Sequence, residues 1–138
     1  MAPDTPGSET SDQPSHVVPR WEWRTFGDAF PEAERRLADL QPERARESDE
    51  LYVLSVEANG SAKFRDGVMD VKRLERVDDD GLELWRPIAK ASEPFDDDAV
   101  HRLVVGLGAS SPELARAEYT LEQLLADIVE PDPLLHPV

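Results

Sequence analysis

Charged and bulky apolar residues alternate strictly over residues 20–26, which read Arg-Trp-Glu-Trp-Arg-Thr-Phe. Successive side chains of a β-strand point to opposite faces, so this alternation predicts a strand with two different faces. We expect the face with Trp21 and Trp23 to be buried in a hydrophobic core. The other face is charged and holds Arg20, Glu22 and Arg24. Whether that face lies in open water or lines a polar cavity decides what it can do.

Alternating apolar and polar residues return after residue 50, in segments separated by turn signals. Asn59-Gly60 and Asp66-Gly67 are dipeptides typical of tight hairpin turns, and the acidic run that ends at Gly81 is a third turn. This spacing is typical of consecutive antiparallel strands and not of strands that alternate with helices. The expected strands cover residues 51–56, 62–65, 68–77 and 82–88.

Three stretches carry the signals of helices. Pro31 suits the first turn of a helix. Asp96 can cap a second helix, which the glycines at positions 106 and 108 end. Thr120 and Gln123 have the spacing of a capping box at the start of a third. The patterns together predict an α+β fold: an antiparallel β-meander of about five strands, with two or three helices packed on the face that carries the tryptophans.

Composition and charge narrow the functions that the chain can have. Its 138 residues fit a single domain, and its formal net charge is −15. Such an acidic chain is not expected to bind a nucleic-acid duplex or an anionic membrane. Of its 15 Lys and Arg residues, 13 lie in residues 20–91. The chain has no cysteine, which excludes disulfides and zinc–thiolate sites.

The chain divides into three parts by composition. Residues 1–19 are acidic and rich in Pro, Ser and Thr, so we expect a disordered tail there. Residues 20–133 form the expected domain, and residues 134–138 are expected to be a truncated or frayed C-terminal end. The N-terminus lacks the basic-then-apolar pattern of a signal peptide, which predicts a cytoplasmic protein.

Basic residues recur at alternate positions on two of the predicted strands. Lys63 and Arg65 share one face, as do Asp70 and Lys72 on the next strand. If these rows and the charged face of residues 20–26 lie on one side of the sheet, they form a surface suited to a phosphate-rich anion, because Arg binds as a planar fork and Lys as a point charge. The alternative is a solvated face whose charges serve only solubility.

The order of these rows resembles the CYTH domain of the triphosphate tunnel metalloenzyme superfamily. That family opens with a strand of the pattern Glu-x-Glu-x-Lys, and later has a basic-x-basic strand and a strand that ends in lysine. The matching positions are Arg20-x-Glu22-x-Arg24, Lys63-x-Arg65 and Asp70-x-Lys72. The resemblance covers residues 20–133. Because the family's tunnel is built from two halves, it implies the N-terminal half of a tunnel-like barrel.

The resemblance implies a domain that binds a phosphate chain: a triphosphate, a nucleotide or polyphosphate. If active, it would be a divalent-metal-dependent phosphohydrolase related to triphosphatases and cyclases, with Mg²⁺ or Mn²⁺ as its cofactor. Glu22 would be the remaining metal ligand, since Arg20 stands where the family has its first Glu. No catalytic residue is assigned. The residues implied in binding phosphate are Arg24, Lys63, Arg65, Lys72 and Arg20.

A second hypothesis comes from the open edge of a half-barrel. Unpaired strand edges can pair with another chain. The alternative function is therefore a non-catalytic binding or assembly module that pairs its sheet edge with a partner or with itself. A second chain or a second half-domain would then complete the sheet.

Overall fold

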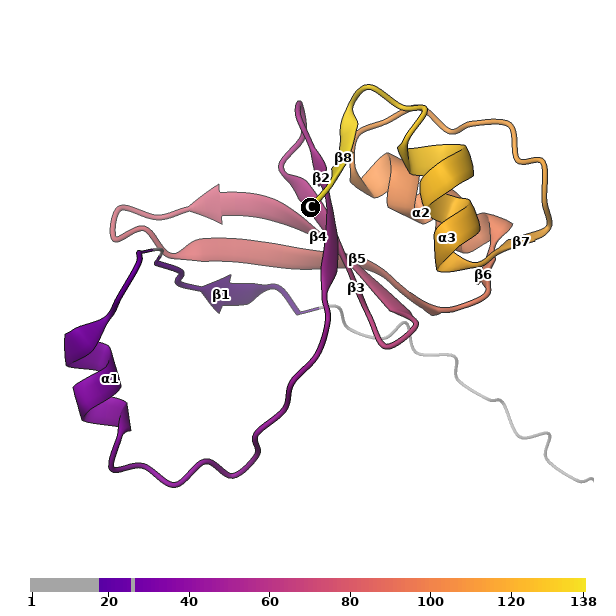
Figure 1. Ribbon diagram of the computed structural model, residues 1–138. Helices are drawn as coiled ribbons and strands as arrows, with labels where there is room; N and C mark the ends of the chain where they lie inside the picture. The colour runs from indigo at the N-terminus through magenta and orange to yellow at the C-terminus, as the bar shows by residue number, and fades with distance from the viewer. Residues whose placement is uncertain (1–17, 26) are drawn as a thin grey trace, which may run out of the picture.

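The computed structural model describes residues 18–25 and 27–138, so most of the predicted tail at 1–19 lies outside the described residues. The fold is α+β, as predicted, with an open antiparallel sheet of six strands in the order β1-β5-β4-β3-β2-β8 (Figure 1). Its strands are β1 (Arg20–Glu22), β2 (Leu51–Ser55), β3 (Gly60–Arg65), β4 (Val68–Val77), β5 (Glu83–Ser92) and β8 (Leu135–Pro137). A second sheet has two antiparallel strands, β6 (Phe95–Asp96) and β7 (Glu118–Tyr119). The helices are α1 (Pro31–Leu37), α2 (Asp97–Gly106), α3 (Leu121–Leu124) and the π-helical turn η1 (Leu125–Val129).

The turn between β3 and β4 is a two-residue hairpin turn, as its sequence predicts. Asp66 and Gly67 have φ angles of 51° and 73°, which is the left-handed backbone that such turns require. At the end of the next hairpin, the Asp78 carboxylate accepts hydrogen bonds from the backbone N–H groups of Asp80 and Leu82. The meander is therefore set by local turn chemistry.

Gly60 was expected in a tight hairpin turn with Asn59, but it lies in a strand. It is the first residue of β3, and the side-chain oxygen of Ser55 holds the preceding connection by accepting from the N–H groups of Glu57 and Ala58. A Cβ at Gly60 would lie 2.5 Å from the carbonyl oxygen of Gly106. Glycine is thus needed here because α2 approaches the sheet closely.

The hydrophobic core lies between one face of the sheet and the layer formed by α2, α3 and η1 (Figure 1). Residues at alternate positions of β3 and β4 face it, in agreement with the predicted alternation. The Phe64 ring packs edge-on against Phe95, with ring centroids 5.8 Å apart. The buried sheet residues include Val53, Ala62, Phe64, Met69, Val71 and Leu135, and those of the helical layer include Val100, Leu103, Val104, Leu124 and Val129.

The helices α2 and α3 begin at the predicted caps, and α2 ends at the predicted glycines. The Asp96 side chain accepts from the N–H of Ala99 at the start of α2, and Thr120 and Gln123 form a complete capping box at the start of α3. At the end of α2, Gly108 has φ 73°, and the N–H of Ala109 donates to the Val104 carbonyl. This is a Schellman motif, which satisfies the last carbonyls of the helix.

The prediction that Trp21 and Trp23 face the core is wrong. Their side chains are 45% and 64% exposed. The reason is where β1 pairs: Trp21 lies opposite Leu84 at the beginning of β5, on the part of the β4–β5 hairpin that extends away from α2 and α3 (Figure 1). The helices pack elsewhere on the sheet and leave both tryptophans largely exposed, although the Arg76 guanidinium lies over the Trp21 ring, 5.0 Å from its centroid.

Two further segments differ from the expectations. α1 forms where Pro31 predicts it, but none of its residues is buried and it stands apart from the helical layer (Figure 1). Residues Leu135–Pro137, expected to be a truncated or frayed end, form β8 and pair with β2. Among the described residues, no helix has the length and apolar character needed to cross a membrane.

Candidate anion-binding face

The charged rows do share one side of the sheet. The Lys72 ammonium lies 3.1 Å from the Glu22 carboxylate, although β1 and β4 are separated by β5. Arg20 and Lys72 line the same hollow, and Lys63 and Arg65 line a second one. We call this side the charged face. It holds Arg20, Glu22, Arg24, Arg46, Glu50, Tyr52, Lys63, Arg65, Asp66, Asp70, Lys72, Trp85 and Lys90.

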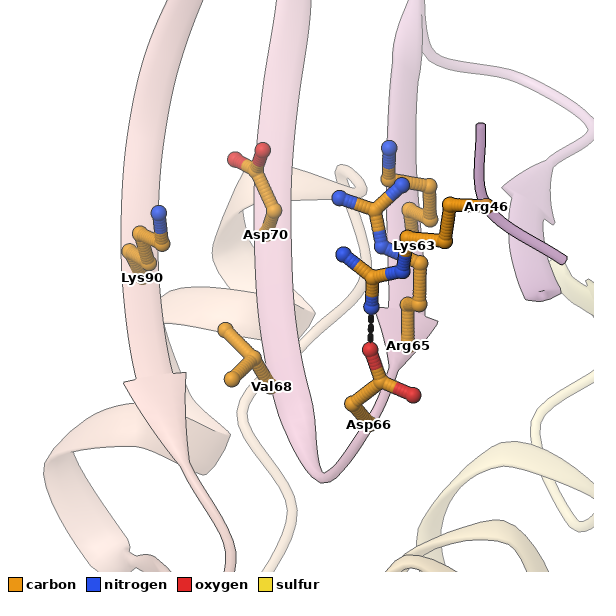
Figure 2. A pocket seen from close by; sticks show the side chains of 7 residues that line it. All are labelled: Arg46, Lys63, Arg65, Asp66, Val68, Asp70 and Lys90. Atoms are coloured by element: carbon orange, nitrogen blue, oxygen red, sulfur yellow. Dashed lines mark ion pairs between the residues drawn. The ribbon is translucent and has the colours of Figure 1, made fainter. Parts of the chain in front are cut away.

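A row of polar side chains crosses four strands at the centre of the charged face. In the strand register, Tyr52 lies opposite Lys63, Lys63 opposite Asp70, and Asp70 opposite Lys90. Two ammonium groups thus flank one carboxylate. Figure 2 shows Lys63, Asp70 and Lys90 on three neighbouring strands, with Arg65 beside Lys63.

Two hollows lie along this row. The first, of about 200 Å³, reaches from Lys90 across Asp70 to Arg46 (Figure 2). The second, of about 170 Å³, lies on the β1 side and is bounded by Arg20 and Trp85. Both hollows share Asp70 and Lys90. Their basic side chains are Arg20, Arg46, Lys63, Arg65, Lys72 and Lys90, and their acidic ones are Asp66 and Asp70. Positive charge therefore gathers here in a strongly acidic chain.

Glu22 holds two of the predicted phosphate-binding residues in place. Its two carboxylate oxygens contact Arg24 at 2.6 Å and Lys72 at 3.1 Å. The hydrogen bond from Arg24 lowers the pKa of Glu22; partial burial opposes this, and Lys72 lowers it further. Glu22 therefore stays ionised and bridges the two cations.

Glu50 does the same for Arg65. Its carboxylate accepts from the Tyr52 hydroxyl at 2.9 Å and from the Arg65 guanidinium at 2.9 Å. Both hydrogen bonds lower the pKa of Glu50, and the one from Tyr52 has the larger effect. Burial, followed by the hydrogen bond to Glu50, raises the pKa of Tyr52, so its phenol keeps its proton at neutral pH. Arg65 is thus oriented by a carboxylate that is itself fixed.

Three cations on the face have no such partner. Within residues 18–25 and 27–138, Arg20, Lys63 and Lys90 form no ion pair with a carboxylate. The cross-strand neighbour Asp70 lies between two of them without contacting either ammonium closely enough to count as a salt bridge. These side chains can turn towards a bound anion without breaking a hydrogen bond or an ion pair to another described side chain.

Sequence reasoning missed Lys90 and Trp85, and the reason is a β-bulge. Val71 pairs with Ala89 but Lys72 pairs with Pro87, so Ile88 is an extra residue in β5. Positions 85 and 90 differ by an odd number and would face opposite sides of a regular strand. The bulge places both on the charged face. Pro87 is the signal that could have revealed it, because proline inside a sheet is found at edges and bulges.

Trp85 is the tryptophan that is buried, with 9% of its surface exposed. The Arg24 guanidinium stacks over its ring, 5.3 Å from the centroid. Its indole N–H donates to Glu83 at 2.8 Å. Trp85 therefore provides an apolar surface that orients Arg24. The sequence analysis did not predict this role for any tryptophan.

Arg46 was also missed, because it lies in the charged connector between α1 and β2. The connector returns alongside β3, and Arg46 forms an ion pair with Asp66 at the β3–β4 turn (Figure 2). No local pattern in the connector indicates this contact, which depends on the path of the chain between two distant elements.

The metal site implied by the CYTH resemblance does not fit the described residues. Both oxygens of Glu22 are engaged by Arg24 and Lys72. Within the described part of the chain, no three His, Asp or Glu side chains come together in a group that could hold a metal ion. A single carboxylate bridging two cations offers little to a Mg²⁺ ion, which is usually held by carboxylates together with the phosphates of its ligand.

Comparison with known proteins found no family model, no curated protein and no solved structure that matches the chain. The CYTH resemblance therefore stays a prediction, carried by the spacing of Arg20, Glu22, Arg24, Lys63, Arg65 and Lys72. What can be argued further about function comes from the charged face itself.

Proposed function

We propose that the charged face binds a phosphate chain, as a triphosphate, the triphosphate group of a nucleotide, or polyphosphate. One observation carries the proposal: six basic and two acidic side chains line two adjoining hollows in a chain whose net charge is −15. A chain with this net charge does not need clustered basic residues for solubility, so solubility alone does not explain the cluster. Fixed cations around a hollow are the arrangement that holds phosphate oxygens.

The layout of the cations favours a chain of phosphates over a single one. Lys63 and Lys90 lie on β3 and β5, two strands apart, so their backbones are separated by about 10 Å. Arg20 lies on β1 opposite Trp85, and its side chain lines the second hollow together with Lys90. One phosphate cannot contact all of these groups at once, whereas a linear chain laid across the strands can.

The paired and unpaired cations have different roles in this proposal. Glu22 and Glu50 hold Arg24, Lys72 and Arg65 in position, which lowers the entropy lost when a ligand binds. Lys63, Lys90 and Arg20 supply positive charge that is not held in an ion pair with a described carboxylate. Asp70 lies between the two lysines and opposes binding of an anion placed directly over it, so the chain is expected to pass beside it.

The proposal is one of binding and includes no metal. The phosphohydrolase activity, with Mg²⁺ or Mn²⁺, stays a prediction from the family resemblance, and no described residue is assigned a catalytic role. Because Mg²⁺ neutralises phosphate chains and finds no cluster of ligands here, we expect it to weaken binding of tripolyphosphate. Release of inorganic phosphate, measured in the same samples, reports on hydrolysis separately.

Calorimetric titration with tripolyphosphate tests the proposal. The double variant Lys63→Glu with Arg65→Glu should lose binding, because it replaces two cations of the first hollow by carboxylates. The matched control is Arg102→Glu with Arg116→Glu, which changes the net charge equally, but at residues paired with Asp98 and Asp127 in the helical part of the chain. The control should bind with nearly unchanged affinity.

Two results would contradict the proposal. One is that the unaltered chain takes up no tripolyphosphate at low ionic strength, where electrostatic binding is strongest. The other is that both double variants weaken binding to the same extent, since this would show attraction by net charge and not by the charged face.

A further inference from the structure

Apolar side chains gather, exposed, along the N-terminal part of the chain. Beyond the two tryptophans, Phe30 of the segment before α1 is 37% exposed and Leu37 at the end of α1 is 61% exposed. A hollow of about 540 Å³ lies beside them. Its lining includes Trp23, Thr25, Ala29, Phe30, Ala33 and Arg36. An apolar surface of this kind marks an interaction site more often than a solvated face.

An open strand edge runs along the same segment. β1 pairs with β5 on one side, and no strand of the described residues pairs with its other side. The opposite edge of the sheet is β8, which has three residues and contains Pro137, whose nitrogen carries no hydrogen. β1 has no proline, so its N–H and C=O groups are the better template for an added strand.

We propose that this edge pairs with the β1 edge of a second copy of the chain, antiparallel about a two-fold axis at Trp23. Charge complementarity identifies the occupant. In this register Glu22 lies opposite Arg24 of the second copy, and Arg24 opposite its Glu22. The two Trp23 side chains face each other, and aromatic and opposite-charge pairs are the cross-strand neighbours that stabilise antiparallel strands.

Neighbouring registers are less favourable. An axis at Glu22 sets the two Glu22 carboxylates against each other. An axis at Trp21 brings Pro19 into the paired stretch, where it cannot donate a hydrogen bond. The chosen register extends β1 to Thr25 and brings the second copy's Trp23 towards the apolar hollow. It joins two sheets into one, with the two charged faces on the same side. The proposed pairing of two copies does not depend on phosphate binding.

Sedimentation velocity over a range of concentrations tests the proposal on the full chain. We expect the mass to double as the concentration rises. Arg24→Glu should shift the chain towards the monomer, because it sets two carboxylates against each other at both ends of the pair. The double exchange of Glu22→Arg with Arg24→Glu should restore the dimer, because it sets opposite charges against each other again. If either residue acted only within its own chain, the exchange would not restore the dimer.

Trp23→Ser should also weaken the dimer, and Val105→Ser is its control, because Val105 is 55% exposed on α2. Circular dichroism shows that each variant is folded. A mass that stays monomeric at every concentration would overturn the proposal. So would a dimer that Arg24→Glu and Trp23→Ser leave unchanged, or a double exchange that fails to restore it.

Discussion

Glu22 is the residue on which most of the charged face depends. It is the only described carboxylate that contacts two of the predicted phosphate-binding residues, Arg24 and Lys72. A carboxylate in this place has opposite effects on two properties. It holds the cations in position, and it offsets part of the charge that attracts an anion.

Glu22→Gln should therefore strengthen binding of tripolyphosphate severalfold, while the chain loses about 0.5–1 kcal/mol of stability at neutral pH, the usual value of a partly exposed ion pair. The measurements are calorimetric titration and urea unfolding. Glu32→Gln is the control, since Glu32 pairs with Arg35 and Arg36 on α1 and lines neither hollow of the charged face. Equal binding by the two variants would contradict the assigned role.

The pH dependence of this effect has a definite sign. The folded-state pKa of Glu22 is lower than its ordinary value of 4.5. Its pairing therefore adds stability above the unfolded-state pKa, and this contribution is lost as the pH falls through the folded-state pKa. The difference in unfolding free energy between the unaltered chain and Glu22→Gln should be constant near neutral pH and disappear in acid.

At the scale of elements, the C-terminal end of α2 is bonded to β4 of the sheet. Its last turn ends in the Schellman motif at Gly108. The Arg73 guanidinium, from β4, donates to the Val105 carbonyl at 3.0 Å. A cation at this end also favours the negative end of the helix dipole. The end of α2 is therefore attached to the sheet by a hydrogen bond from β4.

Gly108→Ala should destabilise the fold by about 1–3 kcal/mol, because alanine is strained at positive φ and because the added Cβ would lie 2.6 Å from the Cβ of Ala58. Gly81→Ala is the matched control. Gly81 also has a positive φ, of 81°, but a Cβ there meets nothing within 4 Å. Urea unfolding should show the larger loss at Gly108, and Ala58→Gly should recover part of it. Equal losses at both positions would show that the contact with Ala58 has no effect.

At the scale of the whole molecule, the described residues form one core, and residues 18–25 and 27–50 contribute no buried side chain to it. Leu103 on α2 is fully buried, whereas Leu37 on α1 is 61% exposed. Leu103→Ala should cost about 2–5 kcal/mol of unfolding free energy, as large-to-small changes in a core do. Leu37→Ala should change it by less than about 0.5 kcal/mol, the range of ordinary surface changes. A large loss at Leu37 would mean that α1 packs on the core.

The sequence determined what depends on neighbours along the chain. Strand alternation sets which side chains share a face, so the convergence of Arg24, Lys63 and Lys72 follows from local geometry once the strands pair. Turn and cap chemistry at Asp66-Gly67 and Thr120 is local in the same sense, because each hydrogen bond joins groups a few residues apart. The turn and the cap were predicted correctly, whereas the shared side of the charged rows was only one of two alternatives.

Only the tertiary structure decided which apolar groups are covered. Trp21 and Trp23 have the pattern of core residues, but burial requires a second layer, and α2 and α3 pack elsewhere on the sheet. The bulge at Ile88 reverses the parity of β5 and places Trp85 and Lys90 on the charged face. Local periodicity fixes the direction of a side chain within a regular strand, but it contains no information on what packs against that side.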